Sequence, residues 1–133
     1  MVTIHQRFFL TAAIVLALDQ LSKYLVRRFF SYTTNTGIAF GFLKEYSSLI
    51  TVVILFALCL LFYYRKTYPV SLGLLFGGAL GNLVDRVFFG AVTDFIEVGF
   101  WPSFNLADSA NTIGVALLLI HFIREEKKKR TLH

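Results

Sequence analysis

Four long apolar stretches alternate with more polar connectors along the chain. They cover roughly residues 8–26, 48–64, 70–89 and 106–123. A helix needs about 20 mainly apolar residues to cross the hydrocarbon core of a bilayer, and each stretch is close to that length. The pattern therefore predicts an all-α membrane protein with four transmembrane helices, built as one domain over residues 1–133.

The two longer connectors carry a different pattern. The connector at residues 90–104 alternates apolar and polar positions over residues 92–98, and this period of two predicts a short strand. The connector at residues 29–46 has β-prone and turn-prone residues, then Gly37 and Gly41. It is expected to form a short strand or a re-entrant piece, and a flap closing over a site is a hypothesis for its glycines.

Composition and charge support a membrane protein. The chain is 56% hydrophobic with a mean hydropathy of +0.67, whereas a soluble domain is about 45–50% apolar. The formal net charge is +5, but no aromatic-interleaved basic face accompanies it, so nucleic acid is not expected as a partner. The single cysteine, Cys59, excludes an intramolecular disulfide. The apolar run from Phe8 to Leu18 lacks a small-x-small cleavage site and is followed directly by Asp19, which favours a retained span over a signal peptide.

Lys and Arg predict the orientation of the chain in the membrane. More of them flank the termini and the connector between the second and third stretches than the other two connectors, which predicts cytoplasmic termini. All four aspartates then lie toward the outer face. The basic residues counted are Arg7, Arg65, Lys66, Arg124, Lys127, Lys128, Lys129 and Arg130 on one side, against Arg27, Arg28, Lys44 and Arg86 on the other.

Small residues follow a helical stripe in the third stretch. Gly73, Gly77 and Gly81 are four apart, and such spacing lets helices approach closely in lipid. A phosphate-binding loop is the alternative for GGALGN, but no strand precedes it and no Lys-Ser/Thr pair follows. Close packing would bring three polar residues to the end of this helix: Asn82, Asp85 and Arg86, the last two as a possible ion pair.

Two polar features of the first half have two interpretations each. Asp19 and Lys23 are four apart, so they share a helix face. They form either an ion pair at the membrane interface or a buried pair that supports a polar site. Asn35 is either a turn residue or a hydrogen-bonding member of such a site.

Carboxylates are the candidate chemistry. The three histidines lie toward the ends expected to be cytoplasmic, so neither a metal site nor a histidine-activated nucleophile is expected. Asp94 lies in the predicted strand, and Asp108 lies in the first turn of a helix, where the macrodipole favours the ionised form. Two close carboxylates share a proton, so one can act as base on water and the other as acid on a carbonyl. Asn82, Asn105 and Asn111 are expected to orient them or a substrate.

Two other interpretations of the aspartates remain open on the residues alone. Asp94 and Asp108 could simply satisfy polar neighbours at the interface. The chain could also be a small ion channel or proton-coupled transporter, in which embedded carboxylates mark an ion path. A transporter should place polar residues in both halves of the bilayer, and the stretch at 48–64 has almost none.

Four segments resemble motifs of lipoprotein signal peptidase (signal peptidase II), a family of bacterial membrane aspartyl proteases. In order they are DQLSKYLV at 19–26, NTGIAFG at 35–41, GGALGNLVDRV with GAVTDFIEV within 77–98, and FNLADSANTIG at 104–114. The resemblance implies four transmembrane helices with a small extracytoplasmic β-rich cradle. It also implies a bacterial cytoplasmic (inner) membrane location, cytoplasmic termini and an active site toward the outer face.

The resemblance further implies an activity. The family removes signal peptides from prolipoproteins by cleaving on the amino side of a diacylglyceryl-modified cysteine, without a metal or other cofactor, and is inhibited by globomycin-type cyclic peptides. Its catalytic aspartates fall on Asp94 and Asp108. Its supporting polar positions fall on Asp19, Lys23, Asn35, Asn82, Asp85, Arg86 and Asn105.

Overall fold

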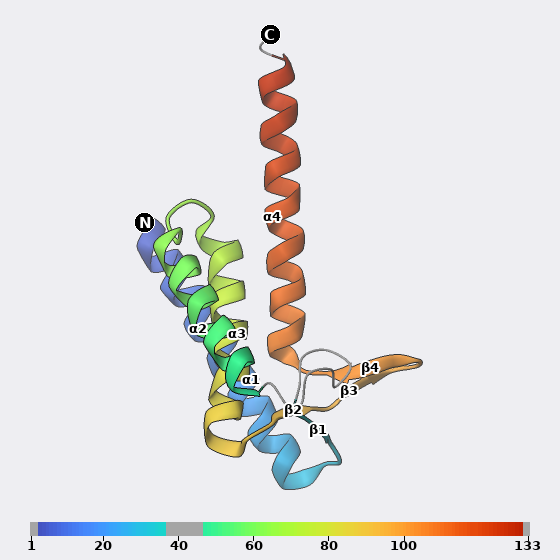
Figure 1. Cartoon of the computed structure of the whole chain (residues 1–133). Coiled ribbons are helices and arrows are strands. Elements are labelled where there is room, and N and C mark those ends of the chain that lie inside the picture. The colour runs from blue at the N-terminus through green and yellow to red at the C-terminus, as the bar shows by residue number, and fades with distance from the viewer. Residues whose placement is uncertain (1–2, 37–46, 132–133) are drawn as a thin grey trace.

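The protein is a bundle of helices with a small β region at one end (Figure 1). The computed structural model describes residues 3–36 and 47–131. α3 is the central helix and packs against the three other helices. The elements are α1 (Ile4–Phe29), β1 (Thr33–Asn35), α2 (Ser47–Tyr63), α3 (Pro69–Phe89), β2 (Val92–Asp94), β3 (Ile96–Val98), β4 (Trp101–Phe104) and α4 (Leu106–Thr131).

Helix length agrees with the membrane class but does not establish four spans. In the part of the chain that the structure describes, α1, α3 and α4 are long and apolar enough to cross a membrane. α2 is apolar but has only 17 residues. A span over α2 therefore stays a prediction, while the mostly helical membrane architecture with a small β region is confirmed.

The helices also extend beyond the apolar stretches. α1 begins early because Thr3 and Gln6 form a capping box, in which each side chain bonds the other residue's backbone N–H. α4 continues through the charged tail as far as Thr131. Glu, Lys and Arg are good helix formers, so the tail extends the helix instead of ending it.

The glycine stripe of α3 is the surface that contacts α1. A Cβ atom on Gly73 would lie 2.8 Å from the Phe8 carbonyl oxygen, and one on Gly77 would lie 2.7 Å from that of Ala12. A side chain at either position would push the two helices apart. The prediction that the stripe serves helix packing is therefore confirmed.

Replacing Gly77 with Ala is expected to destabilise the protein by about 1–3 kcal/mol, the usual cost of overpacking. The new methyl group would meet backbone of α1, which cannot move aside like a flexible side chain. Thermal unfolding in detergent measures the effect, with Ala116→Val on an exposed position of α4 as the control. Equal unfolding temperatures for Gly77→Ala and wild type would contradict this packing.

The β region consists of two antiparallel pairs instead of one strand over 92–98. β1 pairs with β2, and β3 pairs with β4. The change occurs at Phe95, whose N–H donates to the Phe104 carbonyl at 3.0 Å. The chain therefore exchanges one partner strand for another immediately after Asp94. The short strand expected in the first connector is present as β1, whereas Gly37, Gly41 and the hypothetical flap lie outside the described residues.

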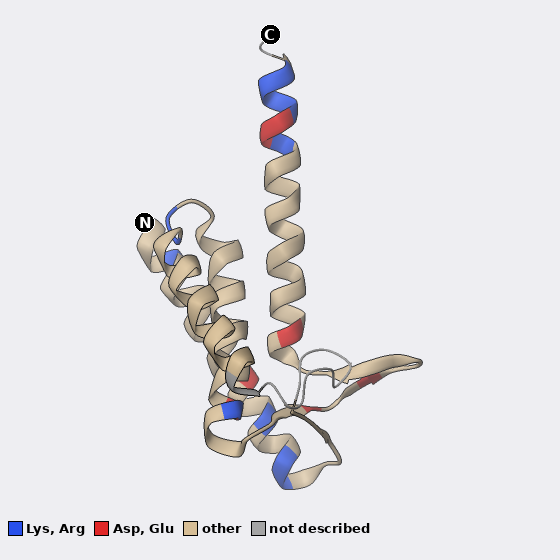
Figure 2. Ribbon diagram, viewed as in Figure 1, with Lys and Arg blue, Asp and Glu red and all other residues tan. Residues whose placement is uncertain are grey.

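The two ends of the bundle differ in what they contain. The chain termini lie at the end away from the strands (Figure 1). At this end, basic residues lie on the last turns of α4 and beside the loop between α2 and α3, and further basic residues lie near the strands (Figure 2). The strand end contains the polar groups described next.

Candidate functional site

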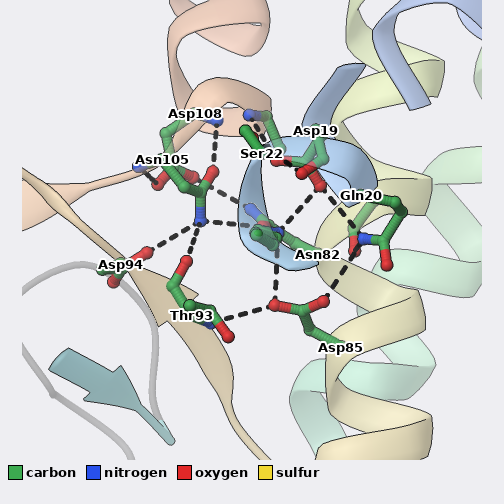
Figure 3. A network of polar contacts seen from close by, with 12 residues as sticks. Asp19, Gln20, Ser22, Asn82, Asp85, Thr93, Asp94, Asn105 and Asp108 are labelled. Atoms are coloured by element: carbon green, nitrogen blue, oxygen red, sulfur yellow. Dashed lines mark hydrogen bonds and ion pairs between the residues drawn. The ribbon is translucent and has the colours of Figure 1, made fainter. Parts of the chain in front are cut away.

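Asp94 at the end of β2 and Asp108 in the first turn of α4 are both bonded by Asn105 (Figure 3). The Asn105 side chain donates from Nδ2 to Asp94 Oδ1 at 2.7 Å. The Asn105 backbone N–H donates to Asp108 Oδ2 at 3.2 Å, and Asn105 Oδ1 accepts the Asp108 N–H at 3.0 Å. This reciprocal pair has the form of a capping box. The contacts that start α4 thus also fix Asp108 relative to Asp94.

Asn82 connects this pair to a buried lysine. Its Nδ2 donates to Asp108 Oδ1 at 2.9 Å, and its Oδ1 accepts from Lys23 Nζ at 2.9 Å. Asn105 Nδ2 also lies 3.1 Å from Asn82 Oδ1. Lysine has only donors, so the Asn82 oxygen must face Lys23 and its amide nitrogen must face Asp108.

Lys23 forms ion pairs with two carboxylates that are as fully buried as Lys23 itself. Its Nζ is 2.8 Å from Asp19 Oδ2 and 3.3 Å from Asp85 Oδ2, and all three side chains are 0% exposed. Arg27 Nη1 adds a contact of 3.5 Å to Asp85 Oδ1. The two cations and two carboxylates balance, which offsets part of the cost of burying charge. The geometry favours the buried-pair interpretation of Asp19 and Lys23 over a pair exposed at the interface.

The two carboxylates of this cluster each bind backbone beside one of the candidate catalytic aspartates. Asp19 Oδ1 accepts the N–H of Ala107, the residue before Asp108, at 2.9 Å. Asp85 Oδ2 accepts the N–H of Thr93, the residue before Asp94, at 2.9 Å. The cluster around Lys23 therefore holds the backbone before Asp108 and the backbone before Asp94 in place.

The environment of Asp94 favours its protonated form. Its side chain is buried in β2, with 3% of the residue exposed. Burial first, and the charge of Asp108 second, raise the pKa of Asp94 to about 6 from its ordinary 3.8. Hydrogen bonds from Asn105 and Asn35 and the charge of Lys23 oppose this rise in pKa. The pKa of Asp94 thus lies in the range useful for acid–base catalysis.

The other predicted residues take distinct places. Asn35 lies in β1 and bonds Asp94. The ion pairs of Asp85 run to Lys23 and Arg27, while the charge of Arg86, its expected partner, interacts most strongly with Asp108. Within the described residues, the Asn111 side-chain oxygen has no hydrogen-bond partner; it lies against the α3 backbone at the α3–α4 contact. No group of three or more potential metal ligands occurs among the described residues.

Sequence reasoning did not identify Gln20, Arg27 or Thr93 as members of the site. Gln20 Nε2 lies within hydrogen-bonding distance of Asp19, Asp85 and the Gly81 carbonyl. Arg27 donates to Thr93 Oγ1 at 2.8 Å and lies over the ring of Phe89. Arg27 follows Lys23 by four residues, so it lies on the same helix face as Asp19 and Lys23. The four-residue spacing that predicted their shared face could therefore also have identified Arg27.

Comparison with known proteins identifies the family. The sequence profile described as "Signal peptidase (SPase) II" matches residues 11–124. The lipoprotein signal peptidase of Moorella thermoacetica is 42% identical, covering 84% of this chain and 89% of its own, and that of Halothermothrix orenii is 36% identical, covering 90% and 97%. A solved bacterial membrane enzyme superposes with a TM-score of 0.84 at 31% identity, covering 90% of this chain and 89% of its own. The chain therefore belongs to the lipoprotein signal peptidase (signal peptidase II) family.

Proposed function

We propose that this protein is a membrane aspartic endopeptidase that removes signal peptides from bacterial prolipoproteins. Cleavage takes place on the amino side of the diacylglyceryl-modified cysteine, with Asp94 and Asp108 activating water. The observation that carries the proposal is the carboxylate pair bridged by Asn105 at one end of an apolar bundle. The names of the relatives support the substrate class.

The reaction needs only the two carboxylates and water. The ionised carboxylate takes a proton from water, whose oxygen bonds to the scissile carbonyl carbon, while the protonated one gives its proton to the carbonyl oxygen. The first step leaves a tetrahedral diol on the former carbonyl carbon. In the second step, as the C–N bond breaks, the amine nitrogen takes the proton that the first carboxylate removed from water. The second carboxylate, which gave its proton to the carbonyl oxygen, takes a proton back from the diol.

The proposed arrangement in the bacterial inner membrane has four spans in a single domain, with cytoplasmic termini. α2 would reach about 25 Å at 1.5 Å per residue, near the lower limit for a span. The site would face outward, since the termini lie at the end away from it (Figure 1). A signal peptide is itself apolar and could enter from lipid, while the diacylglyceryl group stays in the bilayer. Globomycin-type peptides would compete for this site.

The distribution of buried polar groups supports a hydrolytic site over an ion path. An ion path needs polar groups along the depth of the membrane. Within the described residues, every buried polar side chain except Ser71 belongs to the network around Lys23, Asn82 and Asn105. Ser71 lies near the opposite end of α3.

Purified protein in detergent is expected to cleave a diacylglyceryl-modified precursor with a kcat/KM more than about 100-fold above that for the same precursor with an unmodified cysteine. Each buried acyl CH₂ contributes about 0.8 kcal/mol, so the lipid supplies binding energy that the peptide lacks. Mass spectrometry of the products gives the rate and the cleaved bond. Equal cleavage of both precursors, or no cleavage of several lipidated ones, would contradict the proposed substrate class.

A further inference from the structure

We propose that the proton shared by the two carboxylates resides on Asp94, and that Asn82 and the first turn of α4 keep Asp108 ionised. This inference rests on the proposed function and adds a distinct role for each aspartate. The two residues have different surroundings, and the difference begins with the donors around Asp108.

Both oxygens of Asp108 already accept hydrogen bonds from donors that cannot reverse. Oδ1 accepts from Asn82 Nδ2, and Oδ2 accepts from the backbone N–H of Asn105. Asn82 cannot turn its oxygen toward Asp108, because that oxygen faces the ammonium group of Lys23. A proton on Asp108 would therefore weaken these hydrogen bonds, because a neutral carboxyl group accepts less strongly than a carboxylate.

Longer-range charge also favours an ionised Asp108. Its carboxylate lies in the first turn of α4, where the helix macrodipole stabilises a negative charge. The positive charge of Arg86 interacts more strongly with Asp108 than with Asp94 or Asp85. Asp108 is also more accessible to solvent than Asp94, so its charge costs less desolvation.

Asp94 lacks the helix terminus and is the more buried of the two. Its donors are the side-chain amides of Asn105 and Asn35, and burial outweighs them, which agrees with its raised pKa. β1 and β4, which lie against β2, contain no titratable residue. Among the described residues, the charged groups on the other elements packed around this site are Asp19, Lys23 and Arg27 from α1, Asp85 and Arg86 from α3, and Asp108 from α4.

This assignment gives each aspartate one role in the first step. Asp108 takes the proton from water as the water oxygen bonds to the carbonyl carbon. Asp94 gives its proton to the carbonyl oxygen. Asn82 is then a positioning residue, because it acts through Asp108 and not on the substrate.

Carbon-13 NMR of protein labelled at the aspartate carboxyl carbon tests the assignment directly, since the chain has only four aspartates. We expect one resonance to titrate with a midpoint near pH 6. It should be absent from Asp94→Asn. In Asp108→Asn it should persist with a lower midpoint, because the neighbouring negative charge is gone.

The opposite pattern overturns the proposal: a resonance titrating near pH 6 that persists in Asp94→Asn and is lost in Asp108→Asn. A wild type in which no aspartate titrates near pH 6 overturns it as well. Asn82→Ala supplies a second readout. The charge of Asp108 helps to raise the midpoint of the Asp94 resonance, and Asn82 holds that charge, so this midpoint should change in the variant. An unchanged midpoint would show that Asn82 has no part in the assignment. These titrations need no substrate, so they succeed or fail separately from the cleavage assay.

Discussion

Asp94→Asn and Asp108→Asn each lower turnover of a lipidated precursor by about 10³-fold or more, while the protein remains folded. Asparagine keeps the shape of the side chain and its oxygen can still accept from Asn105, but it cannot exchange a proton with water or a carbonyl. General acid–base catalysis by one group contributes about 10²–10⁴-fold, and groups that act as a unit lose nearly everything together. Turnover is measured on the same preparations as thermal unfolding.

Glu97→Gln is the matched control for both substitutions. Glu97 is an exposed carboxylate in β3, only three residues from Asp94. Its neutralisation should leave turnover unchanged. A folded Asp94→Asn or Asp108→Asn protein with near wild-type turnover would remove that aspartate from the chemistry.

The unfolding data should also show that the ionised form of Asp94 lowers the stability of the folded protein. Its pKa of about 6 in the folded protein exceeds the ordinary 3.8, so its contribution to stability is fully present below pH 3.8 and is lost as pH rises through 6. Asp94→Asn should therefore be more stable than wild type above pH 6, by on the order of 1–3 kcal/mol. Below pH 3.8 the difference should disappear, which a pH series of unfolding temperatures would reveal.

Lys23→Met destabilises the protein by about 3–5 kcal/mol, the usual cost of removing one member of a buried ion cluster. The substitution leaves Asp19 and Asp85 buried with only Arg27 as a cation. These two carboxylates bind the backbone before Asp108 and before Asp94, so any fraction that folds should also lose turnover. Chemical or thermal unfolding in detergent gives the magnitude.

Two further variants separate buried charge from general sensitivity. Arg28→Met removes a cation from an exposed position of α1 and should change stability by less than about 0.5 kcal/mol. Adding Asp19→Asn to Lys23→Met removes one uncompensated carboxylate and should restore part of the lost stability. A Lys23→Met protein as stable as wild type would contradict the role of this cluster.

The sequence was sufficient for features that depend on local pattern. Apolar length predicted the helices, and four-residue spacing predicted both the glycine face of α3 and the shared face of Asp19 and Lys23. The position of Asp108 in a first helical turn also followed from local pattern. Periodicity and helix-end chemistry determine these features within a few residues of the chain.

Features that depend on distant partners were not predictable in the same way. The alternation over 92–98 continues through Phe95, but the strand breaks there because its neighbours change from β1 to β4. The partner of Asp85 was expected to be the adjacent Arg86, yet the ion pairs of Asp85 run to α1. Both outcomes depend on how α1 and α3 pack, which no short stretch of sequence contains.

The most direct test of the central claim is the residual turnover of Asp94→Asn, Asp108→Asn and the double variant on one lipidated precursor. Two carboxylates that share one proton act as a unit, so the double variant should lose no more activity than the worse single variant. Losses that multiply would mean that the aspartates act independently. Substantial turnover by any folded variant would contradict the aspartate pair itself.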